Sequence, residues 1–190
     1  MGGSYVYQQE ITANDKAVYD HFGRSVAISS DGTTIIVGSN QDDDGAETQG
    51  SAYIFDWNGS TWSQTQKIVQ SDTLANSDFG FSVSMSDDGT VTAVSAANHD
   101  NPGGTAVTNG GAVYIFTKSG GTWSQTQKMY ASDYTTRADQ FLGYNISMAG
   151  DGSMVVAGAL YNDTTATDSG AAYVFVKSGG VWPVTETQIF

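Results

Sequence analysis

Residues 59–67 read Gly-Ser-Thr-Trp-Ser-Gln-Thr-Gln-Lys, and residues 120–128 repeat them almost unchanged as Gly-Gly-Thr-Trp-Ser-Gln-Thr-Gln-Lys. A looser copy follows at residues 179–187, and the three tryptophans, Trp62, Trp123 and Trp182, are 61 and 59 residues apart. A period near 60 residues with several short apolar runs per unit is typical of a radial or stacked β array. These repeats therefore decide the fold class.

A second repeated block precedes each tryptophan block, at residues 50–55, 111–116 and 170–175, and each copy carries Tyr and Phe two positions apart. In the first unit, short runs rich in β-branched and aromatic residues are separated by Gly, Asp, Asn and Ser, which predicts four strands. Asp31-Gly32 and Asn58-Gly59 fall between strands and favour tight hairpins, because Gly accepts the positive φ of such turns. Four antiparallel strands in up-and-down order, repeated, predict β-propeller blades.

The chain is accordingly expected to be all-β, with three four-stranded blades. Tyr5–Asp15 aligns with Trp62–Asp72, so the first residues are expected to form a lone outermost strand, although the third unit also has its own fourth strand. We expect the three repeated tryptophans to fill the gaps between blades. The expected division is an N-terminal outer strand and linker at 1–19, blade 1 at 20–77, blade 2 at 78–138 and blade 3 at 139–190.

The starts of the units resemble a known family. Phe22-Gly23, Phe79-Gly80 and the altered Phe141-Leu142-Gly143 precede the first strands, and Val-Gly-Ser, Val-Ser-Ala or Ala-Gly-Ala follows in each second strand. This pattern resembles FG-GAP repeats, the blades of the propeller heads of integrin α chains and of many surface proteins. The resemblance implies an extracellular or cell-surface location. It leaves the activity open, since propellers host unrelated functions.

Three blades are fewer than the four to eight that usually close a propeller. Two copies would supply six blades, and closed symmetry is the rule for soluble homo-oligomers. We therefore expect the chain to complete a six-bladed ring as a homodimer.

Composition excludes several classes of function. The 190 residues include no cysteine, which excludes disulfides and zinc-thiolate sites. The net charge of -13 argues against nucleic acid as a partner, and no apolar stretch approaches the roughly 20 residues that cross a bilayer. We expect neither nucleic-acid binding nor membrane insertion.

Most acidic residues fall in the loops that an up-and-down blade places on one face. Asp100 and Asp163 in these loops are candidate ligand-binding residues for a glycan or a basic protein surface, whereas a merely solvated surface is the alternative. Asp residues also recur in the loops between blades. We interpret four of these as structural repeat positions whose carboxylates accept backbone hydrogen bonds in turns, namely Asp72, Asp78, Asp133 and Asp139.

Asn40, Asp42 and Asp44 are the candidate metal ligands, because oxygens at alternate positions before Gly45 let a loop wrap a hard cation such as Ca²⁺. The corresponding loops of the other units are degenerate. Calcium-binding FG-GAP repeats carry their Asp-rich loop between the first and second strands, where this chain has only a short turn. The family's calcium ligands therefore do not carry over by position.

No catalytic residue is proposed from the sequence. His21 and His99 are the only histidines and lie in different kinds of loop, so no Ser-His-Asp set can be assembled. Trp57 is a candidate sugar-stacking platform, with partial packing as the alternative. The sequence favours a non-catalytic binding or scaffold module that assembles with itself. A calcium-assisted, lectin-like module is the second interpretation, and a glycoside hydrolase is the third.

Overall fold

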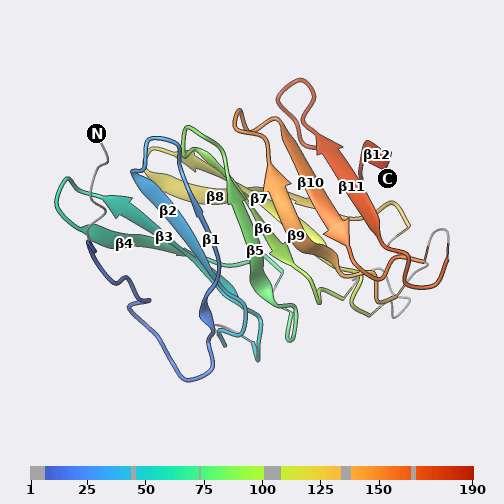
Figure 1. Ribbon diagram of the computed structural model, residues 1–190, viewed down its shortest axis with the longest axis horizontal. Helices are drawn as coiled ribbons and strands as arrows, with labels where there is room; N and C mark the ends of the chain where they lie inside the picture. Colours follow the sequence, from blue (N-terminus) through green and yellow to red (C-terminus); the bar gives the residue numbers. More distant parts are fainter. Residues whose placement is uncertain (1–6, 44–45, 73, 101–107, 134–137, 164–165) are drawn as a thin grey trace.

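The computed structural model describes residues 7–43, 46–72, 74–100, 108–133, 138–163 and 166–190. Within them the chain forms three four-stranded antiparallel sheets, side by side in chain order (Figure 1). Neighbouring strands in each sheet follow one another in sequence, which confirms an all-β chain of three up-and-down propeller blades. No helix in the described residues is long and apolar enough to span a membrane. The strands are β1 Phe22–Ile28, β2 Thr34–Ser39, β3 Ser51–Trp57 and β4 Trp62–Ile68 in blade 1; β5 Phe79–Met85, β6 Val91–Ala96, β7 Ala112–Ser119 and β8 Thr122–Met129 in blade 2; and β9 Leu142–Met148, β10 Met154–Ala159, β11 Ala171–Val176 and β12 Gln188–Ile189 in blade 3.

The innermost strands β1, β5 and β9 join the blades. Gly50 pairs with Phe79 across the first junction, and Gly111 pairs with Leu142 across the second. Leu142 pairs with Ala159 as Phe79 pairs with Ala96, so Leu142 rather than Phe141 takes the position of the family phenylalanine in blade 3. The starts of blades 2 and 3 are thus each held by a glycine of the preceding blade.

Two apolar cores fill the junctions between blades. The first core contains Ile36 and Ile54 of blade 1 with Phe79 and Trp123 of blade 2. The second core joins blades 2 and 3 and includes Trp182. Trp123 and Trp182 are buried, whereas Trp62 is only partly buried, because among the described residues blade 1 has no preceding blade packed against it. The repeated tryptophans therefore differ in burial according to the neighbour that each one has.

The two ends of the chain complete the outer rim differently. Residues 7–13 belong to none of the three described sheets, yet the Gln9 side chain pairs with the backbone of Trp62 through Nε2 to O (3.1 Å) and N to Oε1 (2.8 Å). At the other end, β12 has only two residues, although a full fourth strand was expected. Pro183 lacks the N–H that a ladder needs. The N-terminal segment thus lies on blade 1, and blade 3 has an abbreviated outermost strand.

Candidate functional site

The β2–β3 loops and the loops between blades lie at one end of the sheets, here called the loop face. The β1–β2 and β3–β4 hairpins lie at the other end, here called the turn face. The loop face carries the described candidate residues Asn40, Asp42, Asp100 and Asp163, whereas Trp57 ends β3 on the turn face. Trp57 packs against Trp62 at a centroid distance of 5.5 Å. The structure therefore does not bring Trp57 together with Asp100 and Asp163.

Asp100 and Asp163 hold equivalent loops. Asp100 Oδ1 accepts a hydrogen bond from the backbone N of Asn109 at 2.9 Å, and Asp163 Oδ1 accepts one from Asp168 N at 2.6 Å. In blade 1, Asp43 accepts from Thr48 N at 2.7 Å in the same way. These carboxylates each join the two sides of a β2–β3-type loop through a backbone N–H.

A cluster of Tyr, Asp and Lys lies below the loop face in blades 1 and 2. In blade 2, Asp72 accepts a hydrogen bond from the Tyr114 hydroxyl at 2.9 Å and forms an ion pair with Lys128. The His99 Nε2 atom lies 3.1 Å from Asp72 Oδ2 and 2.7 Å from Lys128 Nζ. His99 is fully buried, and its Nδ1 atom has no partner among the described groups. One carboxylate thus ties together a loop, a central strand and an outer strand.

The contacts in this cluster shift the pKa values of Asp72, Lys128 and Tyr114. Burial raises the pKa of Asp72, but its contacts with His99, Lys128 and Tyr114 outweigh that effect and hold the pKa well below the usual range. Burial lowers the pKa of Lys128, and burial together with the Asp72 charge raises the pKa of Tyr114. The group therefore stays an ion pair with a neutral tyrosine at ordinary pH.

The equivalent cluster of blade 1 contains two carboxylates. Lys67 Nζ contacts Asp15 Oδ2 at 2.7 Å and Asp42 Oδ1 at 3.1 Å, and the Tyr53 hydroxyl donates to the second oxygen of Asp42. Burial raises the pKa of Asp15, but the contacts of Asp15 with Lys67 and Tyr53 lower the pKa by more. The net pKa therefore lies below the usual value. Asp42 occupies the position that His99 holds in blade 2.

Blade 3 keeps part of this arrangement. Asn162 Nδ2 donates to the Tyr173 hydroxyl at 2.8 Å, and that hydroxyl lies 3.4 Å from Asp133 Oδ1. Ile189 pairs with Tyr173 at the register position where Lys67 and Lys128 pair with Tyr53 and Tyr114. The lysine of the cluster is thus replaced by an apolar residue in the last blade.

The candidate metal residues are largely engaged by protein groups. Both oxygens of Asp42 have partners, and Asn40 forms a side-chain hydrogen bond to Asp78. Asp44 lies outside the described residues. No group of three His, Asp or Glu side chains able to hold a metal ion occurs in the described part of the chain. The described candidates, Asn40 and Asp42, are therefore engaged by protein groups in this structure.

Asp78 and Asp139 lie at different positions of their repeats. Asp78 directly precedes Phe79, whereas Asp139 lies three residues before Leu142. Asp78 is buried and accepts from Asn98 Nδ2 at 2.7 Å, and burial raises its pKa. Asp139 Oδ1 accepts from Asn109 Nδ2 at 2.8 Å. Both residues join an inter-blade loop to the loop between β6 and β7, Asp78 through Asn98 and Asp139 through Asn109.

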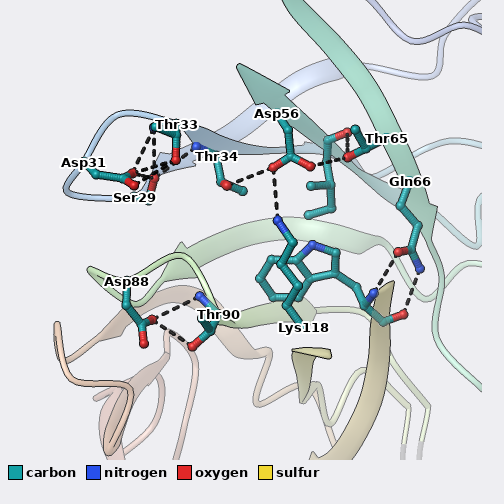
Figure 2. Close-up of polar contacts among 12 residues, drawn as sticks. Ser29, Asp31, Thr33, Thr34, Asp56, Thr65, Gln66, Asp88, Thr90 and Lys118 are labelled. Atoms are coloured by element: carbon teal, nitrogen blue, oxygen red, sulfur yellow. Dashed lines mark hydrogen bonds and ion pairs between the residues drawn. The ribbon is translucent and has the colours of Figure 1, made fainter. Parts of the chain in front are cut away.

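Polar contacts also cross the junction between blades 1 and 2 on the turn-face side (Figure 2). Asp56 accepts hydrogen bonds from Thr34 and Thr65, and Lys118 of blade 2 reaches its Oδ1 atom at 3.2 Å. Burial raises the pKa of Asp56, but these three contacts lower it below the usual value. Figure 2 also shows the side chain of Gln66 pairing with the backbone of Trp123, at 2.8 Å in both directions.

The sequence predictions missed the role of the tyrosine hydroxyls and of Lys67, Lys128 and His99. Their signal was present, because the Asp, Tyr and Lys positions recur with the same period as the tryptophans. The arrangement can hold loops in place and can present an acidic surface. Most of the aspartate carboxylates described above are bonded to other protein groups and hold loops and strands together.

The family of the chain follows from the repeats themselves. Residues 5–55, 62–116 and 123–175 each match the FG-GAP repeat, which together covers most of the chain. This chain belongs to the FG-GAP repeat family. The second and third matched FG-GAP units begin at Trp62 and Trp123, and the first begins in the N-terminal segment. No significant match is found among curated proteins.

Solved structures share the fold of this FG-GAP chain. One is the crystal structure of a protein from Bacteroides uniformis named as a candidate 6-phosphogluconolactonase, with a TM-score of 0.57 and 15% sequence identity. The match covers 96% of this chain and 45% of that one, so the FG-GAP chain spans less than half the length of the solved protein. At this identity the likeness shows the fold alone.

Proposed function

We propose that this FG-GAP chain is a non-catalytic scaffold and binding module that assembles with a second copy into a closed six-bladed propeller. The observation that carries the proposal is the exposure of apolar positions at both ends of the blade series. Ile28 on β1 is 56% exposed, whereas Met85 and Met148 at the same position of β5 and β9 are 7% and 9% exposed. Val156 on β10 is 37% exposed, whereas Ile36 and Ala93 at its position are fully buried.

The two exposed faces are the two halves of the interface that already occurs twice within the chain. Gly38 of blade 1 accommodates blade 2 so closely that a Cβ atom would lie 2.0 Å from the carbonyl oxygen of Gly80. Gly158 is the equivalent residue of blade 3, and a Cβ there would meet nothing closer than 3.8 Å. Gly158 lines a hollow of about 360 Å³ together with Gly170. Blade 3 therefore retains the small residues of the junction beside an open hollow.

The exposed face of blade 1 has the complementary character. An almost wholly apolar hollow of about 360 Å³ is lined by Phe22, Gly23, Val26 and Ile28. Phe22 and Gly23 correspond to Phe79 and Gly80, which fit against blade 1 in the first junction. The apolar surface beside Phe22 and Gly23 is exposed, and an exposed surface of this kind favours docking to another blade.

The non-catalytic part of the proposal is supported by the engagement of the acidic residues. Asp43, Asp100 and Asp163 accept backbone hydrogen bonds, and Asp42 and Asp72 are paired with lysines. A glycoside hydrolase needs two carboxyl groups about 5 to 10 Å apart in a pocket, one of them protonated. These contacts instead favour a rigid acidic platform for a basic protein surface or a glycan, at an extracellular or cell-surface location typical of the family.

Calcium-assisted carbohydrate binding has less support. Calcium accompanies FG-GAP repeats in general, but Asp42 is engaged by Lys67 and Tyr53 in this chain. The possible stacking residue Trp57 lies on the turn face, away from Asp100 and Asp163.

The mass in solution tests the proposed function. Light scattering after size exclusion, at several concentrations, is expected to give a particle of twice the chain mass of 20.0 kDa. A monodisperse particle of one chain mass at every concentration would overturn the assembly. Turnover of a glycoside that is lost in a loop-carboxylate variant would overturn the non-catalytic assignment.

A further inference from the structure

The N-terminal segment, residues 7–14, lies on blade 1 as the fourth strand of a preceding blade would. Gln9 pairs with the backbone of Trp62 as Gln66 pairs with the backbone of Trp123. Asn14 N donates to Gln64 Oε1 at 2.9 Å, and Ser71 N donates to Gln125 Oε1 at the same distance. The contacts of this segment therefore reproduce those that β4 and the loop after it make with blade 2.

The three inner strands of such a preceding blade are not among the described residues. In a ring of two copies, blade 3 of one copy precedes blade 1 of the other. The N-terminal segment of the second copy then reaches the outer edge of β11, where residues 187–190 of the first copy lie. Two segments compete for one strand position.

The backbone of residues 187–190 pairs with β11, where Phe190 and Ala172 exchange two hydrogen bonds at 2.8 Å, but the side chains of these residues fill that position poorly. Phe190 is 71% exposed, whereas Ile68 and Met129, which close the same position in blades 1 and 2, are 3% and 0% exposed. Only Gln188 and Ile189 are in strand conformation, and both are exposed. The preceding residues contact blade 2 instead, since Tyr130 N donates to Val184 O at 2.9 Å and Trp182 is buried.

We propose that in the assembled ring the N-terminal segment of each copy replaces residues 187–190 of the other copy as the outermost strand of blade 3. This strand exchange rests on the proposed function. The repeat register sets the pairing: Ile68 pairs with Ala52 and Met129 pairs with Val113. Ile11 therefore lies opposite Ala172 of the second copy, and buries the position at which Phe190 is exposed.

The side chains at the turn-face end of the same junction agree with this arrangement. Asp56 of blade 1 faces Lys118 of blade 2, and Thr117 and Lys177 line one hollow between blades 2 and 3. The equivalent pair in the third junction is Val176 with Trp57 of the second copy. An apolar residue thus meets an aromatic one at the position where the junction of blades 1 and 2 has an ion pair.

A pair of cysteines tests the exchange, and the chain has no native cysteine to interfere. Opposite residues in an antiparallel pair have Cα atoms about 4.5 to 5.5 Å apart, which allows a disulfide. The double variant Ile11→Cys with Ala172→Cys is expected to give a covalent particle of twice the chain mass after mild oxidation, in denaturing electrophoresis. The matched control, Ile68→Cys with Ala52→Cys, is expected to cross-link within one chain.

The outcomes separate the exchange from the proposed function. A non-covalent dimer in which the control pair cross-links but the test pair does not would overturn the exchange and leave the assembly standing. A particle of one chain mass at all concentrations would overturn both.

A shortened chain gives a second, independent measurement. A variant ending at Glu186 lacks the competing residues 187–190 and is expected to associate at least tenfold more tightly, as measured by the dissociation constant from sedimentation equilibrium. Unchanged or weaker association of a folded variant would contradict the exchange.

Discussion

The residue at one position of the repeat is Asp42 in blade 1, His99 in blade 2 and Asn162 in blade 3. Each is buried and lies beside the hydroxyl of the central tyrosine or the carboxylate bonded to it. The position thus accepts an anion, an imidazole or an amide, provided that its hydrogen bonds can be made. The constant element of the cluster is the pairing of the tyrosine with aspartate.

The depressed pKa of Asp72 predicts an acid-sensitive contribution to stability. A carboxyl group whose pKa is lower in the folded chain stabilises the fold above its unfolded pKa of about 3.9, and this contribution is lost as the pH falls toward the folded pKa. Replacing Asp72 with Asn is expected to cost about 1 to 3 kcal/mol at pH 7. The difference from the parent chain should shrink steadily below about pH 4.

Urea denaturation of both chains between pH 7 and pH 2.5 measures this effect. Asp168→Asn is the matched control, because Asp168 is exposed and, among the described residues, only its backbone N–H is hydrogen-bonded. A free-energy difference that does not change with pH would contradict the role given to Asp72.

At the scale of the element, the fourth strands have nearly the same sequence and different surroundings. β8 carries a buried tryptophan held by Gln66, while β4 carries a partly buried one held by Gln9. The burial of an outer strand is therefore determined by the preceding blade and not by its own residues. The short β12 shows the other limit, since it pairs with β11 and yet both of its side chains are exposed.

This difference predicts unequal effects of one substitution. Trp123→Ala is expected to destabilise the chain by about 3 to 5 kcal/mol, because it empties a packed junction. Trp62→Ala should cost less, about 1 to 2 kcal/mol, since part of that side chain is already in solvent. Thermal or denaturant unfolding of the two variants under the same conditions checks the order, and equal losses would speak against the assigned junctions.

The sequence predicted the strands well because the repeated Tyr-Phe and Trp blocks set the period directly. It did not reveal the contact of Asp72 with Tyr114, because the two residues are 42 positions apart and meet only when a loop folds over a strand. Asp78 and Asp139 seemed equivalent because Phe141 resembles the family phenylalanine. The register shows that Leu142 holds that place.

At the scale of the whole molecule, equivalent glycines distinguish an inner junction from an open face. Gly38→Val places side-chain atoms against the backbone of Gly80 and is expected to cost about 3 kcal/mol or more. Gly158→Val has space within one chain, so the melting temperature of the single chain should change little, while association with a second copy is lost.

Calorimetry and light scattering on the two variants check this contrast. Ser124→Val, on the exposed part of β8, is the surface control for the added apolar bulk. Normal association of the Gly158 variant would exclude the blade 3 face as an assembly surface.

The pairs that meet at the turn-face end of each junction also encode the order of the blades. In the order 1-2-3, Asp56 meets Lys118 and Thr117 lies beside Lys177. A chain rebuilt in the order 1-3-2 would set Lys118 against Val176, leaving an ammonium group beside an apolar residue while the backbone fitted as before. Repeats that are otherwise alike are prone to pair out of sequence as they fold. A few unlike side chains at a single position thus distinguish the correct neighbour of each blade from a wrong one. In the proposed six-bladed ring, a circular permutant that starts at blade 2 would keep the same neighbour for every blade.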